Sequence, residues 1–183
     1  MQCRLHGKRW VKEKPKTDMA FDQNKGIETG RSFAVAPFRI DTLQSYLAGY
    51  WLIKRDIHQV GEGQKVTLNG SASFVVDEKS PADTLIYNEE GLLETPEGKF
   101  DATRSYIYKF IGSALAEVRF SDGEFFHVLD LSAGPLRVEH HCGDDFYQGL
   151  FRAVDTNTWL SVWRIEGPRK KQVISTHYMR VNN

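Results

Sequence analysis

The chain has 183 residues, and its 24 Lys and Arg residues balance 24 Asp and Glu residues, so the formal net charge at pH 7 is zero. This length suits one domain with or without an extension, and a hydrophobic content of 40% disfavours wholesale disorder. No apolar run approaches the roughly 20 residues of a membrane-spanning helix, so we expect no membrane span. The neutral charge also argues against sequence-specific binding of nucleic acid.

The charge is unevenly distributed along the chain. Residues 1–37 carry eight basic and four acidic side chains, a net charge of +4, which leaves −4 for the remainder. This segment has neither helical nor strand periodicity, so we interpret residues 1–37 as a basic N-terminal extension and residues 38–183 as the folded domain. The extension could pack on its own domain or contact a protein partner.

The same segment bears on localisation. It lacks the apolar stretch of a secretory signal, so we expect a protein that is not secreted. The cytoplasm and the matrix of an organelle such as the mitochondrion both remain open.

The first expected element is a short helix over residues 41–48. Asp41 is a suitable N-cap, Leu43 and Leu47 have i, i+4 spacing, and Gly49 stands where a C-terminal glycine commonly ends a helix.

After this helix the sequence predicts only strands. Turn-forming residues recur about every ten positions, and the segments between them alternate in polarity. Residues 105–110, 158–165 and 172–180 each place large side chains on one face, and within residues 124–131 we expect Phe125 and His127 to share a face. We predict an all-β fold of about ten antiparallel strands, closed into a barrel that leaves no exposed edge.

A pair of distant segments resembles the closure of lipocalin-like (calycin) barrels. Gly49, Tyr50 and Trp51 open the first expected strand, and the last one ends at Arg180. The resemblance implies that Arg180 packs over Trp51 and closes one end of the barrel through a cation–π contact.

Residues 40–181 more specifically resemble a family, mainly bacterial and fungal, that is catalogued as a domain of unknown function. The stretches that carry the resemblance are residues 47–55, 87–91, 104–106, 126–130, 140–147 and 163–170. The resemblance implies a calycin-like barrel and brings no established activity, and it identifies no cofactor.

The segment from His140 to Tyr147 concentrates reactive side chains. His140 and Cys142 would share one face of a strand, and imidazole and thiolate are good zinc ligands. However, no ligand pair has the short spacing of common zinc sites, and strand neighbours two positions apart direct their polar groups poorly for Cys–His catalysis. We therefore predict neither a metal site nor a catalytic residue.

A ligand pocket is the alternative for these side chains. It would be lined by inward-facing polar and aromatic residues, namely Arg55, Tyr106, His127, His140, Cys142 and Tyr147. Such a barrel binds one small hydrophobic or amphipathic molecule. A filled core with a buried hydrogen-bond network would use the same residues without a ligand.

Two further charge patterns bear on function. Arg169 and Lys170 lie at a turn that could bind an anion, although such a run is more commonly a solvated turn. Glu89 and Glu90 are neighbours on one strand and would face opposite sides, so they do not form a catalytic pair.

Three functions remain open at this point. The first is a small-molecule-binding barrel. The second is a non-catalytic accessory or structural subunit of a larger assembly, attached through residues 1–37. The third is a lyase-type enzyme, because calycin-like barrels include lyases.

Overall fold

The computed structural model describes residues 38–61, 65–78 and 80–181. The predicted extension, residues 1–37, lies outside the described residues, and the division of the chain at residue 38 stays a prediction. The described residues all belong to one compact unit, which begins at Pro37. Within the described residues, no helix combines the length and the apolar character needed to cross a membrane.

The described chain consists of one short helix followed by ten strands. They are α1 (Leu43–Leu47), β1 (Gly49–Gln59), β2 (Lys65–Val75), β3 (Thr84–Thr95), β4 (Gly98–Ile111), β5 (Leu115–Phe120), β6 (Phe125–Asp130), β7 (Leu136–Cys142), β8 (Asp145–Asp155), β9 (Thr158–Gly167) and β10 (Lys170–Arg180).

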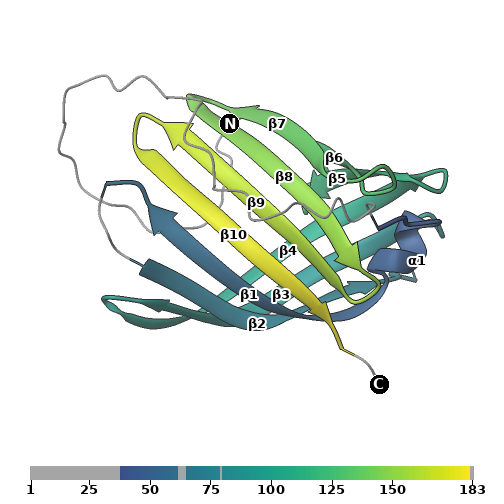
Figure 1. Cartoon of the computed structure of the whole chain (residues 1–183), viewed down its shortest axis with the longest axis horizontal. Coiled ribbons are helices and arrows are strands. Elements are labelled where there is room, and N and C mark those ends of the chain that lie inside the picture. The colour runs from purple at the N-terminus through teal and green to yellow at the C-terminus, as the bar shows by residue number, and fades with distance from the viewer. Residues whose placement is uncertain (1–37, 62–64, 79, 182–183) are drawn as a thin grey trace, which may run out of the picture. The chain divides into compact units, whose positions relative to one another are not determined.

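The strands form a single antiparallel sheet that curls into a nearly closed barrel (Figure 1). All sequential strands except β6 and β7 pair as hairpins, and β1 pairs with β10, so the strand order is β6-β5-β4-β3-β2-β1-β10-β9-β8-β7. The two strands at the ends of this order, β6 and β7, lie beside each other, and in the described structure no hydrogen-bonded ladder joins them. We call this boundary the seam. The all-β, ten-stranded prediction is confirmed.

The helix is shorter than the sequence predicts. Its N-cap is Thr42 rather than Asp41, and the Thr42 side chain makes no capping hydrogen bond. What fixes α1 is burial, because Leu43 and Leu47 are both fully buried against the barrel core. Gly49 then has φ +110°, the conformation in which a glycine ends a helix readily.

Arg180 and Trp51 close the end of the barrel that carries α1, which we call the helix end. The guanidinium carbon lies 4.2 Å from the centre of the Trp51 ring. The same guanidinium donates to the backbone carbonyls of Tyr46 and Ala48, the latter at 2.9 Å. The contact that the calycin resemblance implies is therefore present, and it ties the last strand to the end of α1.

A pair of glycines bends the sheet between β2 and β3. Gly70 and Gly91 are direct cross-strand partners. A Cβ atom on Gly70 would lie 2.1 Å from the carbonyl oxygen of Glu90, and one on Gly91 would lie 2.8 Å from that of Asn69. Only glycine permits two backbones to approach so closely, which lets these long strands curve around the interior.

One predicted face is wrong. Phe125 is 48% exposed, whereas Phe126 is 5% exposed and shares the interior with His127. The cause is a β-bulge, because Val118 pairs with His127 while the next residue, Arg119, pairs with Phe125. The extra residue turns Phe126 inward and breaks the simple alternation.

Candidate ligand-binding site

The interior differs between the two ends of the barrel. At the helix end, the inward side chains of Trp51, Phe74 and Trp159 are at most 1% exposed. The opposite end, which we call the far end, includes the turns at residues 143–144 and 168–169. Toward this end, inward side chains such as His140 and Trp163 are only half-buried. Solvent therefore reaches part of the interior in the far half, where Tyr147 and Ile165 are nevertheless buried, while the helix half is a packed core.

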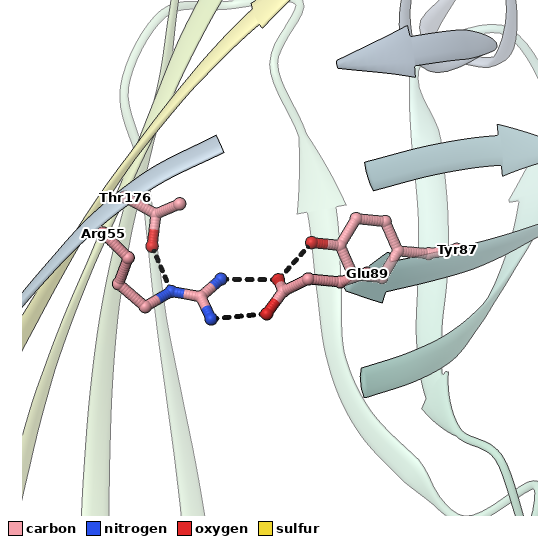
Figure 2. A network of polar contacts seen from close by, with 4 residues as sticks. All are labelled: Arg55, Tyr87, Glu89 and Thr176. Carbon is pink, nitrogen blue, oxygen red and sulfur yellow. Dashed lines mark hydrogen bonds and ion pairs between the residues drawn. The ribbon is translucent and has the colours of Figure 1, made fainter. Parts of the chain in front are cut away.

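An ion pair spans the interior between these halves (Figure 2). Arg55 of β1 donates from Nη1 and Nη2 to the two carboxylate oxygens of Glu89 of β3, each at 2.6 Å. Tyr87 donates its hydroxyl to Oε2 of Glu89 at 2.5 Å, and Arg55 Nε donates to Thr176 Oγ1 at 2.8 Å. All four residues are buried, and they come from three different strands.

Burial and the contacts within this network determine which of its side chains are charged. Burial by itself would raise the pKa of Glu89, but the hydrogen bonds and the charge of Arg55 outweigh burial and hold that pKa below its ordinary value. Burial raises the pKa of Tyr87 well above the ordinary value for tyrosine. Glu89 is therefore an ionised acceptor and Tyr87 a neutral donor, which suits a fixed structural network better than a proton-transfer site.

A row of aromatic rings from β4, β6 and β9, which we call the aromatic wall, lines the interior and crosses the seam. The rings of Phe126 (β6) and Trp163 (β9) are nearly parallel, with centroids 5.0 Å apart, and Tyr106 (β4) continues the row at 5.8 Å from Phe126. His140 of β7 packs edge-on against Phe126 at 5.0 Å and hydrogen-bonds the backbone of that residue. Side chains thus close the seam where backbone pairing stops.

Trp163 fits this wall because its neighbour has no side chain. Gly149 of β8 is its cross-strand partner, and a Cβ atom there would lie 2.9 Å from two carbon atoms of the Trp163 ring. Neither Trp163 nor Phe126 is among the lining residues predicted from the sequence. For Trp163 the signal was available, because it alternates with Trp159 on the inward face of β9.

His127 is held neutral inside the barrel. Its Nδ1 lies 2.7 Å from the carbonyl oxygen of Val128, and because a carbonyl only accepts, Nδ1 carries the proton. Burial lowers the pKa of His127 to about 4. The ring also stacks on Phe151, with centroids 5.0 Å apart.

At the far end, Lys170 is engaged by its own surroundings. Its ammonium lies 2.9 Å from Asp145 Oδ2 and 3.3 Å from the hydroxyl of Tyr147. The anion site at Arg169 and Lys170 stays a prediction, and the ion pair between Lys170 and Asp145 gives it no support. The ion pair instead joins the start of β8 to the start of β10.

The six predicted lining residues fall into two groups. Tyr106, His127 and His140 all contact Phe126, and Tyr147 contacts His140 with ring centroids 6.0 Å apart. Cys142 shares the inward face of β7 with His140 and is half-buried. Arg55 stands apart from them, with its guanidinium engaged by Glu89.

Glu89 has a role in the barrel interior that was not predicted from the sequence. As predicted, it faces the opposite side from Glu90: Glu89 is buried and Glu90 is exposed. Its partner could have been sought among the inward cations, because a buried carboxylate is rarely left unpaired. The described residues contain no cluster of three or more His, Cys, Asp or Glu side chains arranged to hold a metal ion.

Comparison with known families and structures identifies the family of the chain and proteins of similar fold. Residues 47–180 match the profile of a family of unknown function, DUF6314. The chain belongs to this family. A search of curated proteins finds no match.

Among solved structures, an S-type phycobiliprotein lyase, CPES from Guillardia theta, superposes with a TM-score of 0.57 at 8% identity, over 76% of this chain and 91% of the lyase. At this identity the similarity shows the barrel fold alone. Two designed barrels superpose less well. The redesigned β-barrel mFAP1 bound to DFHBI has a TM-score of 0.40 at 12% identity, over 75% of this chain and 97% of its own. A de novo fluorescence-activating β-barrel has a TM-score of 0.40 at 11% identity, over 75% and 96%.

Proposed function

We propose that this protein binds one small, planar, amphipathic molecule in the far half of its barrel. The observation that carries the proposal is the exposure pattern of the interior. Inward side chains are fully buried in the helix half, whereas in the far half Phe120, His140 and Trp163 are only half-buried. They lie beside the buried side chains of Phe126 and Tyr147. A ligand that enters from the far end would complete their burial, which is how small-molecule sites gain most of their affinity.

The aromatic wall gives this ligand its shape. Phe126 and Trp163 present nearly parallel rings, and a planar molecule can extend such a row by stacking. His140 and Tyr147 supply polar edges beside the wall. The ligand-binding role of Arg55 stays a prediction, and it has less support than that of the other lining residues, because three of its five N–H donors already bind Glu89 and Thr176.

The neutral dye N-phenyl-1-naphthylamine tests the proposal, since its fluorescence rises in an apolar site. We expect saturable binding at one dye per chain. Phe126→Leu should weaken binding several-fold by removing a stacking ring, while the matched variant Phe125→Leu, on the outer face of the same strand, should bind like the unmodified protein. Thermal unfolding of both variants checks that the fold is retained.

Native mass spectrometry of the protein purified from its source gives a second readout. We expect a bound mass that is released on denaturation. Absence of a bound species together with absence of dye binding would overturn the proposal. Equal weakening by Phe125→Leu and Phe126→Leu would overturn the interior location.

The other two functions have less support. The role of accessory subunit rests on residues 1–37, which lie outside the described residues, so the protein partner and the organellar or cytoplasmic location stay predictions. Lyase-type activity also stays a prediction, and the engaged carboxylate of Glu89 gives it no added support.

A further inference from the structure

A second guanidinium faces the interior beside the Arg55–Glu89 pair. Arg104 of β4 lies two positions from buried Tyr106, so both side chains are on the inward face of the strand. Arg104 is also the direct cross-strand partner of Glu89. Its guanidinium carbon lies 6.0 Å from the centre of the Tyr106 ring, at the edge of the aromatic wall.

Glu89 does not neutralise Arg104. Both of its carboxylate oxygens accept hydrogen bonds from Arg55, and one also accepts from Tyr87. Within residues 38–61, 65–78 and 80–181, Arg104 forms no ion pair. Arg104 nevertheless lies near enough to help lower the pKa of Glu89. The middle of the barrel therefore holds two guanidinium groups and one carboxylate.

This surplus positive charge lies where a ligand can reach it. Arg104 is one inward position nearer the far end than Tyr106, and its side chain is half-buried. A cation that is partly removed from water without a counter-ion is unfavourable, and an anion that comes to it is correspondingly favoured. The planar fork of arginine suits two parallel hydrogen bonds to two oxygens of one carboxylate, sulfonate or phosphate group.

We propose that the ligand is a planar organic anion whose acidic group binds Arg104 and whose ring system contacts Tyr106 and Phe126. This inference rests on the proposed function and adds the charge class of the ligand. Tyr106 joins the part of the site that would bind the acidic group to the part that would bind the rings. It lies beneath Arg104, and it continues the row of rings to Phe126.

Two dyes of nearly the same shape separate charge from shape. 8-Anilino-1-naphthalenesulfonate carries one sulfonate, whereas N-phenyl-1-naphthylamine has the same ring system without it. We expect the intact protein to bind the sulfonate more tightly. Arg104→Gln should weaken binding of the sulfonate by about tenfold or more while changing binding of the neutral dye by less than about twofold.

Lys109→Gln is the matched control, because Lys109 is on the same strand, faces outward and is exposed. It should leave the affinity for both dyes unchanged. Arg104→Lys keeps the charge without the fork, and we expect an affinity for the sulfonate between those of the intact protein and Arg104→Gln. Thermal unfolding of every variant confirms that losses of affinity do not come from unfolding.

The outcomes distinguish the two proposals. Binding of the neutral dye with no preference for the sulfonate would overturn the inference and leave the binding barrel standing. The same holds if Arg104→Gln weakens both dyes equally, or if Lys109→Gln matches its effect. Failure of both dyes to bind the intact protein would overturn the proposed function, and this inference with it.

Discussion

Arg55 and Glu89 meet inside the barrel with each carboxylate oxygen 2.6 Å from a different guanidinium nitrogen, although their strands, β1 and β3, are separated by β2. Both side chains are almost completely removed from solvent. Such a pair depends on both members, because removal of one leaves an uncompensated charge in a medium that solvates it poorly.

We expect Glu89→Gln to lower the free energy of unfolding by about 3–5 kcal/mol, since Arg55 then stays buried without its counter-ion. The triple variant Arg55→Met, Tyr87→Phe, Glu89→Leu removes the whole network, and its loss should be clearly smaller. Urea unfolding measures both, and Glu90→Gln, on the exposed face of the same strand, is the control. A triple variant no more stable than the single one would contradict this account.

Two buried tryptophans differ in one hydrogen bond. Trp51 Nε1 donates to the carbonyl of Leu47 at 2.8 Å, whereas Trp159 Nε1 has no hydrogen-bond partner among the described residues. Both rings are at most 1% exposed. Because the loss of volume is the same, Trp51→Phe should cost about 1–3 kcal/mol more than Trp159→Phe, owing to the carbonyl left unpaired. Chemical denaturation tests this, and equal costs would argue against it.

Arg180 combines a cation–π contact with hydrogen bonds to two carbonyls at the end of α1. A lysine cannot serve both carbonyls while lying flat over Trp51, so we expect Arg180→Lys to lower the unfolding free energy by about 1–2 kcal/mol. Arg152→Lys on the exposed face of β8 should change it by less than about 0.5 kcal/mol. Similar losses for the two variants would show that the closure adds little stability.

His127 should make stability depend on pH. Its pKa is about 4 in the folded protein against an ordinary value of 6.5, so the unfolded chain binds the proton more readily. Stability from this residue is complete above pH 6.5 and declines as the pH falls toward 4, by up to about 1.4 kcal/mol per pH unit. In His127→Gln this component of the decline should disappear.

The control for this prediction is His177→Gln, because His177 is exposed on β10. Urea unfolding from pH 7.5 to 4 would be compared among the unmodified protein, His127→Gln and His177→Gln. The pH dependence that carboxylates contribute is the same in all three proteins and cancels in the comparison. Parallel curves for His127→Gln and the unmodified protein would contradict the buried, neutral histidine.

Local patterns predicted most of the fold. Alternation of side chains identified the inward faces of β4, β9 and β10, because a strand with one buried face must repeat every second residue. The bulge at Phe126 was not predictable in this way, since an extra residue is fixed by the partner strand and leaves no mark in the local pattern.

The site was less predictable than the fold because its contacts cross the barrel. The inward direction of Arg55 follows from β1 alone, but its pairing with Glu89 depends on how far the sheet has curled between β1 and β3. Likewise, the meeting of Phe126 with His140 depends on closure at the seam. Sequence spacing carries no information on either distance.

The close approach at Gly70 and Gly91 has a consequence beyond curvature. At this point each strand presents bare backbone to the other, and a Cβ atom on either side would collide with a carbonyl oxygen. If β2 slid by two residues against β3, a residue with a side chain would have to occupy that position. The glycine pair thus fixes the register of the β2–β3 hairpin. Because β2 also pairs with β1, this register determines where Glu89 of β3 lies relative to Arg55 of β1.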